Sequence, residues 1–148
     1  MLRFEGDRDF SLPPANVFAK LTDARFLVTC IPDIETLNEV EPDHAKVVLR
    51  PGLSFMRGSL NLTLRIAEAD VPTAARVLLT TKGLGSSSTV EAALTFVPQG
   101  DGTHVHWAAD VKELRGLLKM VPAGLIQGAA QKVINDVWAK VETNFANF

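Results

Sequence analysis

The chain has 148 residues, of which 47% are apolar and 22% charged, and its formal net charge is −2. This length and balance suit one soluble globular domain over residues 1–148, with a core large enough to hold a cavity. The sequence has no cluster of Lys and Arg that could neutralise phosphates, which argues against nucleic-acid binding. With one Cys, no secretory signal and no run of about 18 apolar residues, we expect a cytoplasmic protein without a transmembrane segment.

The beginning of the chain predicts one strand followed by a short helix. Residues Leu2–Phe10 alternate loosely between apolar and polar side chains, as strands do. The next segment, SLPPANVFAKLTD, changes to a helical pattern. Pro14 suits a first helical turn, and Val17, Phe18 and Leu21 form an apolar stripe along one face.

A second short helix is predicted over Ala24–Cys30. It should end before Pro32, because a residue that precedes proline avoids the helical region. Cys30 would then lie at a helix C-terminus, where the helix dipole disfavours a thiolate. Its neighbours Val28 and Ile31 are apolar. We therefore interpret Cys30 as a buried structural thiol rather than a nucleophile.

Alternating patterns predict six further strands in the middle of the chain. In the clearest of them, the apolar residues Leu60, Leu62 and Leu64 share one face and polar residues take the other. Such alternation is typical of antiparallel strands with one buried face, and short turns such as EPD and QGDG join them as hairpins. The six strands are predicted at Ile34–Val40, His44–Arg50, Gly58–Ile66, Ala75–Leu84, Ser88–Val97 and His104–Glu113.

The last segment predicts one long amphipathic helix. From Pro122 onward, apolar residues recur at spacings of three and four. A sheet with one apolar face needs a cover, and this helix is the one predicted element long enough to provide it. We therefore predict an α+β fold in which a curved seven-stranded antiparallel sheet wraps around the C-terminal helix, with two short helices between the first and second strands. A straight helix does not match a curved sheet along its whole length, so a cavity can remain between them.

Four segments carry a resemblance to a known family: FSLPPANVFAKLTD, CIPDIETL, KGLGSSSTVEAALTFVP and DGTHVHWAADVKELRGLLKMVPAGLI. They resemble the START-like, or SRPBCC, superfamily with its helix-grip fold, and within it the family of CoxG, a component of carbon monoxide dehydrogenase. That family usually has Gly after Cys-Ile-Pro, where this chain has Asp33. If the Gly adopts a positive φ, Asp tolerates that angle better than most residues. Each segment marks a turn or an element boundary, so the resemblance implies a fold and an association with a redox enzyme rather than a reaction.

A set of apolar residues can face the predicted space between sheet and helix. Most of them fit a plain hydrophobic core, and some can line a ligand cavity. Gly116, Gly124 and Gly128 lie near the helix start beside Pro122, which favours a thin or mobile entrance there. The candidate cavity-lining residues are Phe26, Phe55, Leu62, Leu64, Leu79, Leu94, Phe96, Trp107, Met120, Leu125, Ile126 and Val133.

Histidines raise the possibility of a metal site. His104 and His106 lie two apart on one predicted strand, so both point to the same face. Val105 and Trp107 take the inward face, which leaves both histidines outside. In the resembled fold the last strand pairs with the first, so His44 lies far across the sheet. We expect neither Cys nor a carboxylate cluster to complete a zinc site there, and therefore predict no metal.

Other polar residues offer little for catalysis or cofactor binding. Glu91 and Asp110 are expected on the solvent face, and whether Glu91 or Arg65 reaches a cavity mouth stays open. The chain has no Tyr to act as an acid or an oxyanion donor. The segment KGLGSSS lacks the Lys-Ser/Thr ending of a phosphate loop, so it is interpreted as a hairpin turn, and no cofactor is predicted.

Three functions stay open at this point. The first, which the apolar set favours, is non-catalytic binding of a small hydrophobic molecule such as a lipid, a quinone or a polyketide-like compound. The second, which the resemblance implies, is an accessory or assembly factor for a molybdenum-type redox enzyme similar to carbon monoxide dehydrogenase. It requires an exposed apolar patch near the helix start. The third is an enzyme of the cyclase or hydratase type, which requires polar groups that converge inside the cavity.

Overall fold

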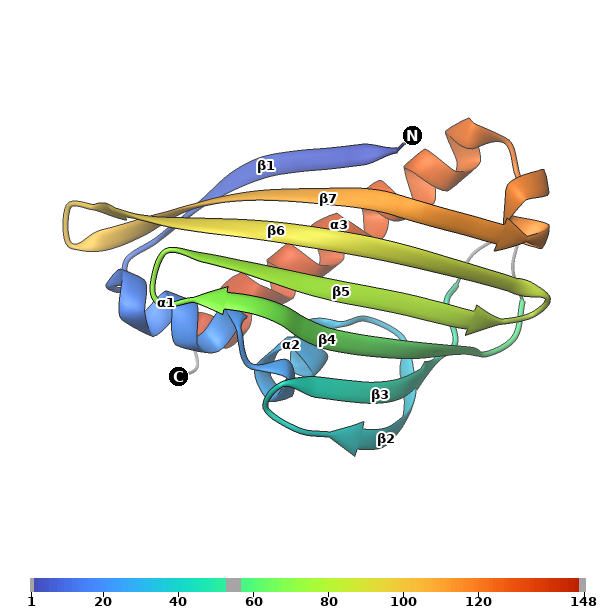
Figure 1. Cartoon of the computed structure of the whole chain (residues 1–148), viewed down its shortest axis with the longest axis horizontal. Coiled ribbons are helices and arrows are strands. Elements are labelled where there is room, and N and C mark those ends of the chain that lie inside the picture. Colours follow the sequence, from blue (N-terminus) through green and yellow to red (C-terminus); the bar gives the residue numbers. More distant parts are fainter. Residues whose placement is uncertain (1, 53–56, 147–148) are drawn as a thin grey trace.

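The computed structural model describes residues 2–52 and 57–146 of the chain. A long C-terminal helix crosses one face of a seven-stranded antiparallel sheet diagonally, and two short helices lie at one end of that face (Figure 1). This arrangement confirms the predicted α+β helix-grip fold. The elements in chain order are β1 Arg3–Phe10, α1 Pro14–Leu21, α2 Ala24–Cys30, β2 Ile34–Val40, β3 His44–Leu49, β4 Leu60–Asp70, β5 Ala74–Gly83, β6 Ser86–Gln99, β7 Gly102–Gly116, the 3₁₀ helix η1 Leu117–Met120 and α3 Ala123–Ala146.

The sheet has the strand order β1-β7-β6-β5-β4-β3-β2. Strands β2 to β7 follow one another as hairpins, and β1 pairs antiparallel with β7, with Phe4 opposite Ala109. The first and last strands are therefore neighbours, as the resemblance implied. Register shifts between Ile66 and Glu68 and between Thr89 and Val90 mark bulges, which bend a strand and increase its twist.

The stretch around the single cysteine has the local structure that its sequence predicts. Asp23 caps α2 by accepting a 2.9 Å hydrogen bond from the backbone N–H of Arg25, and the helix ends at Cys30. After Pro32, Asp33 adopts a φ of 62°, and its carbonyl accepts a 2.9 Å hydrogen bond from the N–H of Arg50. The expectation that Asp takes over the left-handed position of the usual Gly is therefore confirmed.

The segment between the last strand and α3 differs from the prediction. Strand β7 continues beyond Glu113 to Gly116, whose φ of 71° turns the chain into η1, and α3 begins only after Pro122. The N–H of Leu118 donates to the hydroxyl of Ser86 at 3.2 Å, which fastens η1 to the β5–β6 hairpin. The sequence pattern did not show this 3₁₀ turn, because a four-residue element carries no measurable periodicity. Of the helices that the structure describes, none is long and apolar enough to cross a membrane.

One end of the helix-covered face, which we call the packed end, is closed by α1, α2 and residues 134–145 of α3 (Figure 1). The ring of Phe145 lies 4.9 Å from that of Phe10 and 5.2 Å from that of Phe26, so the last turns of α3 contact both β1 and α2. Phe18 of α1 meets Phe96 of β6 at 5.1 Å. Aromatic pairs of this kind add about 0.5–1.5 kcal/mol each beyond the burial of their area.

The other end, which we call the open end, consists of η1, residues 123–133 of α3 and the β5–β6 turn at residues 83–86. The backbone N–H of Leu117 donates to the carbonyl of Gly85 at 3.1 Å, so η1 and this turn lie together. Large apolar side chains are left in solvent here: Leu117 is 63% exposed, Met120 81% and Leu125 51%. The two ends of the same fold therefore differ sharply in how well their apolar surface is covered.

Candidate functional site

The helix-covered face of the sheet is incompletely buried near the β5–β6 turn. Its residues there, which we call the open-end inner face, are half-buried, whereas the inward residues of the same strands toward the packed end are fully buried. Three of them, Leu79, Val90 and Leu114, pack against the edge of the core. The open-end inner face consists of Leu79, Thr81, Ser88, Val90 and Leu114.

The sheet register explains why these side chains share one face. Thr81 lies opposite the buried Leu62 on β4 and opposite Ser88 on β6, and Ser88 lies opposite Leu114 on β7. Leu79 lies opposite Val90 in the neighbouring row. These rows cross four strands, and α3 runs diagonally away from them, as Figure 1 shows. Sheet residues beside the helix rather than beneath it stay accessible.

A pair of hydroxyl groups is the polar feature of this surface. The side-chain oxygens of Thr81 and Ser88 lie 2.5 Å apart and form a hydrogen bond. One hydroxyl donates to the other, so the pair keeps one further donor and several lone pairs for another molecule. Neither group ionises near neutral pH, and the remaining residues of the open-end inner face are apolar. The arrangement can hold an apolar molecule and contact one of its oxygen atoms.

The residues that the sequence predicted as cavity lining fall into different environments. Leu79 belongs to the open-end inner face, and Ile126 is buried but lies apart from the main core. Met120, Leu125 and Val133 are exposed. Phe55 lies outside the described residues. The remaining predicted residues are buried members of the main core: Phe26, Leu62, Leu64, Leu94, Phe96 and Trp107.

Sequence reasoning missed four of the five residues of the open-end inner face. Val90 and Leu114 were passed over, and Thr81 and Ser88 were assigned to a hairpin by the polar run KGLGSSS. The signal was present, because continuing the inward alternation from Leu79 places Thr81 on the same face. Polar residues at inward positions are easily mistaken for the start of a loop.

Cys30 lies in the packed end and has no features of a reactive thiol. Its side chain is fully buried, and that burial raises the pKa of the thiol. The amide of Asn144 on α3 donates to Thr29 Oγ1 at 2.9 Å and to Cys30 Sγ at 3.6 Å, so the thiol belongs to a contact between α2 and α3. The interpretation of Cys30 as a structural residue is confirmed.

The histidine pair lies on the outer face, as predicted, but one expectation about it was wrong. Carboxylates do surround it, because β1 pairs with β7 in the register that places Asp7 opposite His106. His104 contacts Asp9 at 2.6 Å through Nδ1 and Asp7 at 2.9 Å through Nε2, and His106 Nδ1 lies 2.9 Å from Asp7. Hydrogen bonds to Asp9 and Asp7 raise the pKa of His104, and those from His106 and His104 lower the pKa of Asp7.

These contacts are ion pairs rather than a metal site. Among the described residues, no group of three or more His, Cys, Asp or Glu side chains has an arrangement that could hold a metal ion. Asp110, on the same outer face, binds Arg3 at 2.9 Å. The cluster fastens the edge strand β1 to β7.

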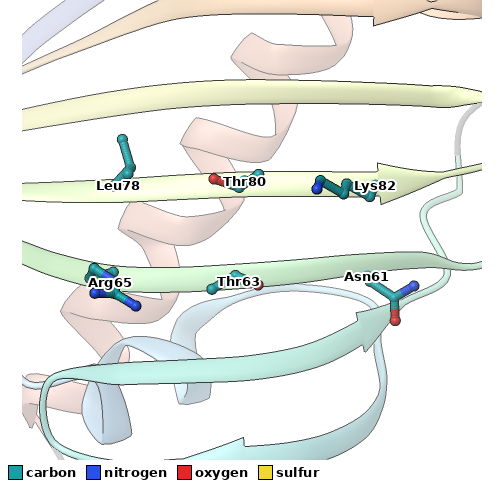
Figure 2. A pocket seen from close by; sticks show the side chains of 6 residues that line it. All are labelled: Asn61, Thr63, Arg65, Leu78, Thr80 and Lys82. Atoms are coloured by element: carbon teal, nitrogen blue, oxygen red, sulfur yellow. The ribbon is translucent and has the colours of Figure 1, made fainter.

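The outer face also answers where Arg65 and Glu91 lie. Glu91 pairs with Arg76 at 2.8 Å, so both are held away from the helix-covered side. Arg65 lines a shallow groove of about 310 Å³ between β4 and β5, as Figure 2 shows. The groove is lined by Asn61, Thr63, Arg65, Leu78, Thr80 and Lys82.

Comparison with known proteins agrees with the fold and identifies a family. Solved structures similar to this chain include a conserved protein from Geobacillus kaustophilus (TM-score 0.84, 20% identity, covering 99% of this chain and 96% of that one). Others are a START superfamily protein from Mycobacterium smegmatis (TM-score 0.66, 13% identity, 96% and 95%) and the AHSA1 protein from Silicibacter pomeroyi (TM-score 0.65, 13% identity, 98% and 98%). At these identities the likeness shows the fold alone.

No curated protein matches the sequence. A family model, in contrast, matches residues 6–146, and it describes CoxG, a component of carbon monoxide dehydrogenase. The match spans nearly the whole chain and confirms the resemblance found in the sequence. The chain belongs to the carbon monoxide dehydrogenase CoxG family.

Proposed function

We propose that this protein is a single cytoplasmic domain, residues 1–148, that binds a small hydrophobic molecule without transforming it. The molecule, such as a lipid, a quinone or a polyketide-like compound, lies against the open-end inner face, between the sheet and α3. The observation that carries the proposal is the half-buried state of Leu79, Val90 and Leu114, which remain accessible beside a fully packed core.

Burial supplies the driving force for such binding. Removing apolar area from water contributes about 25 cal/mol per Å², so each 100 Å² covered by a ligand contributes roughly 2.5 kcal/mol. An apolar surface with a few polar groups is typical of small-molecule sites. Here Thr81 and Ser88 provide the polar contact, and their hydrogen bond keeps both hydroxyls satisfied when the site is empty.

The composition of the surface supports binding over catalysis. General acid–base chemistry needs a group that exchanges a proton near the working pH, and the open-end inner face offers only two hydroxyls among apolar side chains. The histidines and the carboxylates that pair with them lie on the opposite face of the sheet. A cyclase or hydratase would need ionisable groups on the covered side.

Native mass spectrometry of the full chain purified from its source tests the proposal. We expect an apolar small molecule to travel with the protein and to be released on unfolding. In the variant Val90→Trp the indole fills the open-end inner face, and bound ligand should fall at least tenfold. Val97→Trp is the matched control, because Val97 lies on the same strand but is exposed on the outer face. Equal ligand content in both variants would rule out this site.

A second function, an accessory factor for a redox enzyme, is favoured by the apolar side chains left in solvent at the open end. Leu117 and Met120 project from η1, and patches of this kind mark interaction sites. Family membership supports a carbon monoxide dehydrogenase-like partner. In a pull-down from the source, the tagged chain should retain such an enzyme, and the double variant Leu117→Asp/Met120→Asp should lose it while still binding the small molecule. Retention of the enzyme by that variant would exclude the patch as the docking surface.

A further inference from the structure

The groove on the outer face of β4 and β5 combines hydroxyl groups with cationic side chains. Thr63 and Thr80 lie opposite each other at its centre, Arg65 lies toward one end and Lys82 toward the other, as Figure 2 shows. Strand residues four apart are separated by about 13 Å, and directly paired side chains by about 5 Å. Two flexible cationic side chains therefore flank a compact pair of hydroxyl donors.

A third cation lies beside the same centre. Lys46 of β3 lies directly opposite Thr63, and the sheet alternation points it outward, because its neighbours Ala45 and Val47 are buried in the core. Three positive charges therefore surround two threonine hydroxyls on a chain whose formal net charge is −2. The local charge is opposite in sign to that of the whole chain.

These three cations are also uncommitted, unlike others on the same face. Within the part of the chain that the structure describes, Lys46, Arg65 and Lys82 form no ion pair. By contrast, Arg76 pairs with Glu91 at 2.8 Å. Asp43 lies near enough for the charge of Arg65 to help lower its pKa, but its carboxylate is hydrogen-bonded to His44. The groove therefore has positive charge available for a ligand.

We propose that this outer-face groove binds a small, soluble, phosphate-bearing molecule. A phosphate group presents several oxygen acceptors, which can accept from both threonine hydroxyls and from a lysine while the guanidinium of Arg65 binds two oxygens side by side. A volume of about 310 Å³ fits a small molecule. The large apolar residues left in solvent, such as Leu117 and Met120, lie on η1 and not around the groove, so a bilayer is not the occupant that this face fits. The proposal does not depend on the binding of an apolar molecule on the other side of the sheet.

Methyl NMR of the full chain, with pyrophosphate as the probe, tests this groove. We expect saturable shifts of the Thr63 and Thr80 methyl signals that exceed those produced by sodium chloride at the same ionic strength. Inorganic phosphate should produce the same shifts with weaker affinity, because it carries fewer charges. Shifts that match those of chloride would overturn the proposal, and so would binding to phosphatidic acid vesicles without binding to pyrophosphate.

Charge variants locate the binding. Arg65→Gln and Lys82→Gln should each weaken pyrophosphate binding about threefold, and the double variant about tenfold, as expected for solvent-exposed ion pairs. Arg76→Gln is the matched control, because Arg76 lies on β5 and on the same face but binds Glu91 outside the groove. It should change the affinity less than twofold. An equal loss in Arg76→Gln and Arg65→Gln would show a general charge effect and refute a site. Thermal denaturation confirms that each variant is folded.

Discussion

The packed end and the open end of this protein are built on the same strands, yet their interiors differ. At the packed end, Phe145 of α3 contacts both Phe10 and Phe26, and helices from both parts of the chain close over the sheet. At the open end, the inward residues of β5, β6 and β7 are half-buried, and η1 exposes its apolar side chains. One end therefore carries the stability of the fold, and the other keeps apolar surface available.

The difference teaches how a small fold separates stability from binding. A helix that crosses a sheet diagonally covers only part of it, and the short helices α1 and α2 add cover at one end alone (Figure 1). Apolar surface left uncovered contributes less to folding, but it can contribute to binding a ligand. The following predictions test this division from its largest consequence to its smallest.

The largest effect should come from truncating a residue of the packed end. Phe145→Ala removes ring contacts to Phe10 and Phe26 and leaves a cavity, so the free energy of unfolding should fall by about 3–5 kcal/mol. Leu125→Ala, at a half-exposed position of the open end, should cost less than about 1 kcal/mol. Urea denaturation of both variants measures the difference. Similar losses would show that the two ends share the stability of the fold.

Removing the hydroxyl pair should change the choice of ligand at the open end. The probes are 2-acetylnaphthalene and 2-ethylnaphthalene, which have nearly the same shape but differ in one carbonyl oxygen. We expect the protein to prefer the acetyl compound about fivefold through one hydrogen bond. In the double variant Thr81→Val/Ser88→Ala that preference should disappear, while the ethyl compound binds as before. Fluorescence titration measures both affinities. A preference that survives in the variant would place the ligand elsewhere.

Two glycines near the open end should respond to substitution with opposite signs. A side chain at Gly128 would meet open space, so Gly128→Ala should stabilise α3 by about 0.5–1 kcal/mol. Gly116 has a φ of 71°, and a Cβ there would collide with the carbonyl of Gly85, so Gly116→Ala should destabilise by about 1–3 kcal/mol. Thermal or urea denaturation reads both effects. A loss of stability in Gly128→Ala would show that this stretch of helix packs more closely than the structure indicates.

The smallest effect should be a dependence of stability on pH that leaves the open end untouched. The pKa of His104 is raised by Asp9 and Asp7, so its contribution is complete below its unfolded pKa of about 6.5 and is lost as pH rises through the folded value. The pKa of Asp7 is lowered, so its contribution is present above an unfolded value of about 4 and is lost as pH falls through the folded value. The urea midpoint should therefore be higher at pH 5.5 than at pH 9.

His104→Gln should reduce that difference between the two midpoints without abolishing it. The remainder comes from His44, whose pKa Asp43 and Glu39 raise in the same way. Ligand affinity at the open-end inner face should be equal at both pH values, because its residues do not titrate in this range. A midpoint in His104→Gln that varies with pH as much as in the original chain would exclude this contribution.

Much of the fold could be predicted because its signals are local. The helix at Ala24–Cys30 and the strand at Ile34–Val40 have the boundaries that their patterns predict, and Asp33 adopts the positive φ expected of it. The ends of β6 and β7 extend beyond their alternation, because hydrogen bonding to a neighbouring strand continues past the residues that carry the pattern. The 3₁₀ turn η1 is held by a contact to Ser86, which is distant in sequence and invisible to periodicity.

The candidate site was predicted less well for a related reason. Alternation shows which residues point inward, but not how completely the helix covers each of them, so buried Leu62 and half-buried Leu79 could not be told apart. The carboxylates beside His104 were missed because Asp7 and Asp9 lie about a hundred residues away in sequence and meet it through strand pairing. Likewise, Lys46, Arg65 and Lys82 become neighbours only across three strands.

The sequence by itself determined the order of the elements, the inward and outward face of each strand, and the family. Those properties depend on turn residues and side-chain periodicity, which act over a few residues. The tertiary structure alone decided which end of the sheet is closed and which outer-face charges meet. The diagonal path of α3 and the pairing register of the strands set these properties, because burial and charge proximity depend on contacts between distant segments.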